Sequence, residues 1–319
     1  MGVVPGRRPV LVAMAVGVLA VLAMAQQDQD DVVGVYQPRD PCPQVETIVQ
    51  QIVADEVRQN PQITAGFLRV FFHDCFTGGC DASILLDGEW NAPPNRGSVQ
   101  PRVRELVNVI RDRVNRVCGD KAVSCADILA LATRDSVVAA KGPRVPISRG
   151  RFDSLTFGTN GDIPSPFDSI AKLRQTFGKF KLDKAADLVA LSGGHTVGKT
   201  RFCGGVVRPD FKANCNAKGS HDLDVITPVV FDNQYFVGLN RSLGVFPTDQ
   251  KLLTDDAETR NLVIAFARDQ NEFFKQWTTS FKKLSDVNWV SQKTGEIRRD
   301  CARTNSGRLG SIIQDAADQ

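Results

Sequence analysis

The sequence predicts a mainly α-helical protein, and three observations lead to this fold class. Apolar residues recur at helical spacing along most of the chain, strand-like runs are few and short, and no segment is repeated or of low complexity. The chain has 319 residues, of which 42% are hydrophobic and 24% charged, so it is long enough to bury a sizeable core. We therefore expect helices packed around an interior site, with very little β structure.

Helical periodicity marks several separate stretches of the chain. In the last of them, Trp277 and Phe281 belong to an apolar stripe whose members are three and four residues apart. We expect Asp183 to cap the start of the helix over residues 182–191 and Gly193-Gly194 to end it. In chain order the stretches are 45–57, 67–76, 106–117, 125–132, 182–191, 259–267 and 274–284.

Residues 1–25 have the features of a secretory signal peptide. Arg7 and Arg8 form a basic start, an apolar run over residues 10–22 follows, and small residues precede Gln26. The alternative is an uncleaved membrane anchor, but the run is too short to span a bilayer comfortably, and no later stretch could span one. We expect a protein secreted to the extracellular space or the cell wall, without stable membrane association.

Charge and cysteine content narrow the function further. The net charge is only +3, without a long run of one sign, which argues against nucleic acid or an anionic membrane as the main partner. All eight cysteines follow the signal peptide, and an even number in a secreted chain predicts four disulfides, although spacing leaves their pairing open. Asn240 begins the one N-glycosylation sequon of the chain.

The stretch 67–76 is apolar almost all round, which predicts a buried helix. It places Arg69, Phe72 and His73 at positions i, i+3 and i+4, and therefore on one helix face. A buried arginine is costly unless it is paired or meets a negative charge. One interpretation is a catalytic face; the other is a structural arginine paired with a carboxylate, beside a core histidine.

A second histidine, His195, follows Gly193-Gly194 and precedes Gly198. A neutral imidazole is a common metal ligand, and glycines allow a bulky cofactor to approach the backbone. The alternative is a histidine that interacts with the dipole at a helix C-terminus. The chain contains no HExxH, CxxCH or glycine-rich phosphate loop, and its remaining histidine is His221.

A series of motifs resembles the plant secretory (class III) haem peroxidases over about residues 35–306. Their order along this chain is the order in that family. The motifs are RVFFHDCF at 69–76, GCDAS at 79–83, VSCADI at 123–128, LSGGHT at 191–196, FDNQY at 231–235, TDQ at 248–250 and GEIRRDC at 295–301.

The resemblance implies a fold and an activity. The domain of residues 26–306 is expected to be the helical haem peroxidase fold, with haem b between a distal and a proximal half. It would reduce hydrogen peroxide at the haem iron, oxidise small phenolic donors by one-electron steps, and act as a monomer. Two alternatives stay open: a haem-free or catalytically impaired secreted protein on the same scaffold, and a wall-binding protein with incidental activity.

Roles carry over by motif to the two histidines and their partners. His195 is expected to be the axial ligand of the haem iron, and Asp249 its hydrogen-bond partner. His73 is expected to act as base and then acid, and Arg69 to supply positive charge where the peroxide bond breaks. The resemblance further implies that Asn95 orients His73, that Glu89 lies behind Asn95, and that Phe72 shields the iron.

Two calcium sites, a donor opening and the disulfide pairing also follow from the resemblance. The first calcium would bind Asp74, Thr77, Gly79, Asp81 and Ser83, and the second Thr196, Asp224, Thr227, Val230 and Asp232. Pro164 and Phe167 would line the opening for donors, and Asp127 would pair with Arg151. The implied disulfides are Cys42–Cys118, Cys75–Cys80, Cys125–Cys301 and Cys203–Cys215.

The chain also departs from the family pattern. Trp90 stands where relatives have lysine, residues 100–105 replace an arginine-glycine-phenylalanine step, and Leu223 replaces an aromatic residue. The segment 203–224 is short, which predicts little room for extra helices and a wider donor opening. The tail 307–319 extends past the usual end and is either a removable vacuolar-sorting propeptide, with vacuolar location as the alternative, or a plain terminus.

Overall fold

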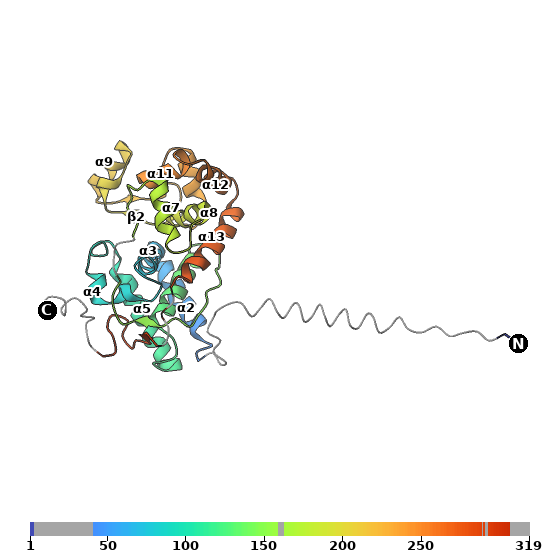
Figure 1. Cartoon of the computed structure of the whole chain (residues 1–319). Coiled ribbons are helices and arrows are strands. Elements are labelled where there is room, and N and C mark those ends of the chain that lie inside the picture. The colour runs from blue at the N-terminus through green and yellow to red at the C-terminus, as the bar shows by residue number, and fades with distance from the viewer. Residues whose placement is uncertain (3–40, 159–162, 289, 291–292, 307–319) are drawn as a thin grey trace, which may run out of the picture. The chain divides into compact units, whose positions relative to one another are not determined.

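A computed structural model describes residues 1–2, 41–158, 163–288, 290 and 293–306 (Figure 1). The chain divides into two compact units, residues 1–38 and 39–319, and the helices and strands of the described residues belong to the second. The predicted signal peptide, apart from residues 1–2, and the tail 307–319 lie outside the described residues.

The first half of this unit is a group of helices around α6, which is buried along nearly its whole length. α2 packs its valine and isoleucine stripe against α6, and α3 packs against both α5 and α6. These elements are α2 (Val45–Gln59), α3 (Ile63–Cys75), η1 (Ser83–Leu85), α4 (Asp87–Trp90), α5 (Pro101–Cys118) and α6 (Cys125–Ala139).

The second half begins at α7 and contains the remaining helices. α13 returns across this half and packs against α8, burying Trp277 and Phe281 as the sequence predicts. The elements are α7 (Ile170–Gly178), α8 (Ala185–Ser192), η3 (Gly193–Thr196), η4 (Cys203–Gly205), α9 (Pro209–Lys218), α10 (Gln234–Asn240), α11 (Pro247–Thr254), α12 (Ala257–Arg268) and α13 (Gln270–Ser285).

Strands contribute little among the described residues, in agreement with the predicted fold class. β1 (Asp153–Ser154) pairs antiparallel with β4 (Gly295–Glu296), and β2 (Lys199–Thr200) pairs antiparallel with β3 (His221–Asp222). The first pair joins the C-terminal segment to the first half. Figure 1 shows α3 between α2, α4 and α5 on one side and α7 and α8 on the other.

All four disulfides form as the family resemblance implies: Cys42–Cys118, Cys75–Cys80, Cys125–Cys301 and Cys203–Cys215. The Cys125–Cys301 bond joins residues 176 positions apart, so it restricts the unfolded chain strongly. The expected buried ion pair is also present, with 2.9 Å between Arg151 Nη1 and Asp127 Oδ1. None of the helices in the described ranges is long and apolar enough to cross a membrane.

Two expectations about local structure are wrong. Asp183 does not cap α8: the helix begins at Ala185, its N-cap position is Lys184, and Asp183 therefore lies one residue too early. The short segment 203–224 does accommodate a further helix, the ten-residue α9. Val206 and Cys215 form a small separate apolar cluster that holds it, with Leu223 packed against them.

Candidate active site

The end of α3 presents Arg69, Phe72 and His73 on one face, as the helical spacing predicts. His73 is buried, with 1% of its surface exposed. α3 is largely buried, as the sequence predicts, but Arg69 is exposed, and its guanidinium donates to Ser98 Oγ (Nη2–Oγ 3.0 Å). Neighbouring protein atoms nevertheless remove part of its hydration, which lowers the pKa of Arg69. Among the described residues no ion pair joins it to a carboxylate, so the interpretation as a paired structural arginine loses its support.

A chain of hydrogen bonds fixes the orientation of His73. Asn95 Nδ2 donates to the backbone oxygen of Glu89 (3.0 Å), so its amide oxygen is the acceptor for His73 Nδ1, 2.6 Å away. The proton of the neutral ring is thereby assigned to Nδ1, which leaves Nε2 free to accept one. Burial, and secondly the charge of Arg69, lower the pKa of His73 to about 3.

His195 lies in the 3₁₀ turn η3 that continues directly from α8, after the break at Gly193 that the sequence predicts. Its Nδ1 lies 2.8 Å from Asp249 Oδ1. Asp249 is buried in the first turn of α11, where the helix dipole favours a carboxylate, and its Oδ2 accepts from the backbone N–H of Phe246 (2.9 Å). The bond to Asp249 leaves Nε2 of His195 as the nitrogen for a metal.

A further side chain contacts this carboxylate, and the sequence reasoning gave it no role. The hydroxyl of Tyr235 donates to Asp249 Oδ1 at 2.9 Å, and its side chain is buried in α10. Tyr235 is the last residue of the motif that begins at Phe231, and its place in that motif is the sequence feature that could have indicated a role for it. Tyr235 and Asp249 are 14 residues apart in the sequence, and they meet because α10 packs against α11.

Buried carboxylates lie close together directly after His73. Asp74 is completely buried, and both its oxygens accept backbone N–H groups, from Ala82 (2.9 Å) and Ile84 (3.2 Å). Burial raises the pKa of Asp74 well above its usual value, and the charges of Asp81 and Glu89 add to this. A cation bound nearby would stabilise the ionised form of such buried carboxyl groups.

Oxygen atoms of the same loop surround these carboxylates. Thr77 Oγ1 lies 2.9 Å from Glu89 Oε1 and 3.0 Å from the backbone oxygen of Asp74, and Ser83 is buried. Gly79 lies against Asn288, since a Cβ at Gly79 would be 2.3 Å from the backbone oxygen of Asn288. The five predicted residues thus lie between the last turn of α3 and the start of η1, where Asp81 Oδ1 accepts from the backbone N–H of Ser83 (3.0 Å).

A second oxygen cluster adjoins His195. The hydroxyls of Thr196 and Thr227 each lie within 3.3 Å of a carboxylate oxygen of both Asp224 and Asp232. Each hydroxyl has one hydrogen, so at most two of these four contacts are hydrogen bonds, and the others bring lone pairs together. Burial raises the pKa of Asp224. Nowhere in the described residues do three or more His, Cys, Asp or Glu side chains form a metal-binding group, so hydroxyl and backbone oxygens would complete either site.

Comparison with known proteins decides the family. The peroxidase family model matches residues 49–269. Cationic peroxidase SPC4 of Sorghum bicolor is 41% identical over 311 residues, covering 87% of this chain and 85% of the relative. Peroxidase 40 of Arabidopsis thaliana is 39% identical, covering 85% of each, and peroxidase C1B of Armoracia rusticana is 37% identical, covering 87% and 88%.

The chain belongs to the peroxidase family. Within it, the identity to plant class III members extends over most of the chain, and the helical fold with four disulfides agrees. The activity is that of a haem peroxidase, which confirms the expectation from the motifs.

Pro164 and Phe167, the residues expected at the donor opening, lie in the loop before α7, where the backbone oxygen of Pro166 accepts from the backbone N–H of Thr248, next to Asp249. Pro164 is half-buried, and Phe167 is 53% exposed. Phe202, 56% exposed, meets Phe167 edge to face with ring centroids 6.2 Å apart. Lys251 donates to the backbone oxygens of residues 167 and 168, which attaches this loop to α11. Phe202 was not among the residues expected here.

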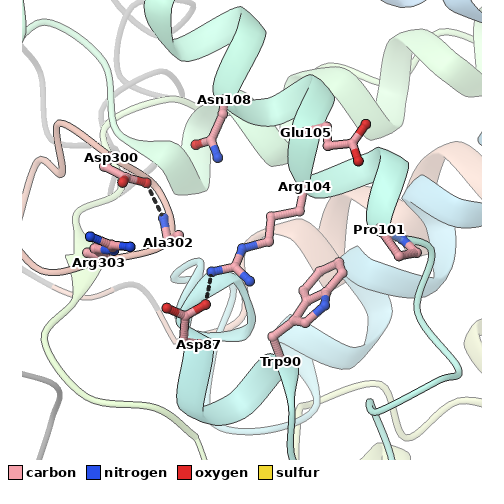
Figure 2. A pocket seen from close by; sticks show the side chains of 9 residues that line it. All are labelled: Asp87, Trp90, Pro101, Arg104, Glu105, Asn108, Asp300, Ala302 and Arg303. Atoms are coloured by element: carbon pink, nitrogen blue, oxygen red, sulfur yellow. Dashed lines mark hydrogen bonds and ion pairs between the residues drawn. The ribbon is translucent and has the colours of Figure 1, made fainter.

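The departures at Trp90 and residues 100–105 meet at one surface cavity of about 340 Å³ (Figure 2). Arg104 lies 5.4 Å above the Trp90 ring and pairs with Asp87. Figure 2 shows its guanidinium between the two side chains. The aromatic ring at position 90 thus faces a cation from α5.

Proposed function

We propose that this peroxidase binds haem through His195 and reduces hydrogen peroxide with the help of His73 and Arg69. The observation that carries the proposal is that each histidine directs Nδ1 to a buried, fixed acceptor: Asn95 for His73 and Asp249 for His195. In both rings this leaves Nε2 as the reactive nitrogen. The third histidine, His221, differs in that its Nδ1 meets a backbone oxygen, that of Asp222, and not a side chain.

The residues present fit haem. Thirty-nine per cent of the His195 side chain is exposed although its partner Asp249 is buried, so a ligand can reach the ring. The segment after His195 lies against α3: Gly198 has φ +106°, and a Cβ there would be 2.7 Å from the Cβ of Ala65. The two histidine-bearing segments are therefore neighbours. Bound haem supplies iron that accepts electrons from donors and passes them to peroxide.

The protein's own part is to orient and to move protons. Nε2 of His73 would take a proton from peroxide and return it to the departing oxygen, because its low pKa keeps the ring neutral. Arg69, held by Ser98, would stabilise the negative charge that develops. Phe72, half-buried beside His73, would limit access by bulky molecules.

We also propose a calcium ion in each oxygen cluster. In the cluster after His73, the raised pKa of Asp74 supports a hard cation beside the carboxylate. In the cluster after His195, there are more oxygen–oxygen contacts than hydroxyl hydrogens to bridge them, which supports a hard cation there as well. The distal ion would bind Asp74, Thr77, Gly79, Asp81 and Ser83, and the proximal ion Thr196, Asp224, Thr227, Val230 and Asp232. Asp74 and Thr196 directly follow the two histidines, so each ion would brace one of them.

Small phenols are the proposed donors, with Pro164 and Phe167 at the opening where they bind. The exposure of Phe167 beside Phe202 supports contact with an aromatic ring. Removal of residues 1–25, secretion as a monomer, glycosylation at the exposed Asn240 and a propeptide role for 307–319 belong to the same proposal. The vacuole remains the alternative destination if the tail is a sorting signal.

Replacing His195 with alanine tests the central assignment. Wild-type protein with haem should absorb near 400 nm, and the His195→Ala variant should fail to retain haem normally. His221→Gln is a matched control, because His221 is buried and its Nδ1 lies 2.7 Å from a backbone oxygen. Full haem content and an unchanged spectrum in His195→Ala would overturn the assignment. A wild-type protein that binds no haem would favour the haem-free alternative.

A further inference from the structure

Tyr235 touches the partner of the proposed haem ligand. Its hydroxyl donates to Asp249 Oδ1 at 2.9 Å, and its ring meets that of His195 edge to face, with centroids 6.1 Å apart. The side chain is 3% exposed, so water does not compete for the bond. Tyr235 also packs against Phe236 (5.0 Å between centroids), which holds the ring in place.

His195 and Tyr235 share one acceptor atom. Asp249 Oδ1 accepts from His195 Nδ1 and from the Tyr235 hydroxyl, while Oδ2 accepts from the backbone of Phe246. Each donor draws negative charge from the carboxylate. In a buried site hydrogen bonds to one group influence each other strongly, so a donor at Oδ1 weakens the attraction of that oxygen for the His195 proton.

We infer that Tyr235 is a positioning residue that limits how strongly Asp249 polarises His195, and thereby how electron-rich His195 is toward the haem iron. The inference rests on the proposed function, since it assumes that His195 is the iron ligand. The contact geometry carries it: a tyrosine with only a packing role could satisfy its hydroxyl on any backbone carbonyl. Here the phenol is directed to the oxygen that the histidine uses.

The helix that carries Tyr235 supports the same role. α10 begins two residues after Asp232, whose Oδ1 accepts from the backbone of Gln234 at its first turn. One short helix thus connects the proximal oxygen cluster with Asp249. Asp232 holds the first turn of α10, and near its end the backbone oxygen of Leu239 accepts from Gln250 Nε2 (3.1 Å), next to Asp249.

The experiment compares haem-bound wild type with Tyr235→Phe. Loss of the phenol should make His195 more anionic in character, which strengthens its bond to iron and favours the ferric state. We expect the iron–histidine stretching frequency of the reduced protein to rise. We also expect the ferric-to-ferrous equilibrium to shift by roughly tenfold, about 59 mV toward negative reduction potential.

Thr259→Val is the matched control. It removes a fully buried hydroxyl, which donates to the backbone oxygen of Leu252 (2.7 Å), without touching Asp249. Both variants should lose thermal stability, but only Tyr235→Phe should shift the frequency and the reduction potential. Equal thermal losses with no shift in either quantity would show that Tyr235 is structural only and overturn the inference.

Fluorotyrosine keeps the test decisive if Tyr235→Phe does not fold. The chain has two tyrosines, so Tyr36→Phe leaves Tyr235 as the single site of incorporation. A fluorinated phenol is a stronger donor of nearly the same size, so both quantities should move in the opposite direction. An unchanged frequency and potential would contradict the inference. A wild-type protein without haem absorption would instead overturn the proposed function, and this inference with it.

Discussion

The two histidine networks of this peroxidase use the same side chain with opposite partners. His73 donates to Asn95, a neutral amide that is itself fixed by the backbone of Glu89. His195 donates to Asp249, a carboxylate. His73 is almost completely buried, whereas the side chain of His195 is 39% exposed.

The difference between the acceptors explains how one residue type can serve two purposes. A neutral amide orients an imidazole without stabilising its positive form much, so burial keeps His73 neutral and ready to accept a proton. A carboxylate increases the electron density of the ring, which suits a metal ligand. Under the proposed function, the acceptor on Nδ1 would therefore decide which role the free Nε2 takes.

Replacing His73 with leucine should have the largest effect on catalysis. Loss of the proton acceptor should lower the bimolecular rate constant for peroxide by roughly 10²–10⁴-fold, while haem remains bound. Stopped-flow spectroscopy with peroxide measures this rate, and His221→Gln should leave it close to wild type. A decrease below twofold for His73→Leu would remove the proposed distinction between the two histidines.

Asn95→Asp should sharpen the comparison by giving His73 the kind of partner that His195 has. In wild type the peroxide rate should fall only as the pH approaches about 3, since protonated His73 cannot accept a proton. A carboxylate stabilises the protonated ring, so the variant should lose rate at a pH higher by roughly 1–3 pH units. Rate constants measured from pH 3 to 7 check this. Coincident profiles would show that the amide has no influence on proton acceptance.

Calcium removal should have the smallest effect on either histidine, because the ions act through neighbouring residues. Each bound ion should contribute roughly 2.7 kcal/mol of stability when free calcium is 100 times Kd. Chelation should therefore lower Tm by roughly 5–10 °C per ion and reduce activity, and added calcium should restore both.

Single-site variants separate the two ions. Asp81→Asn should remove the ion next to His73, and Asp232→Asn the ion next to His195, each leaving one calcium by elemental analysis. Active wild-type protein with no calcium would contradict both sites. One ion in the wild type that is lost only in Asp81→Asn would contradict the proximal site.

Local sequence alone determined part of this site. The helical repeat places Arg69, Phe72 and His73 on one face because residues three and four apart are neighbours on any α-helix. Family motifs added the acceptors Asn95 and Asp249, although Asp249 is 54 residues from His195 and no local rule connects them. The four disulfide pairs also came from the motifs, since spacing left them open.

Only the tertiary structure decided how exposed each group is and which groups share a partner. Arg69 is exposed on a helix that is otherwise largely buried, and α9 forms in a short segment because Val206 and Cys215 provide it with an apolar cluster. The hydroxyl of Tyr235 reaches Asp249 because α10 and α11 pack together. Periodicity specifies which side chains share a helix face, but burial and hydrogen-bond partners depend on what lies opposite that face, and this is fixed only when distant segments pack.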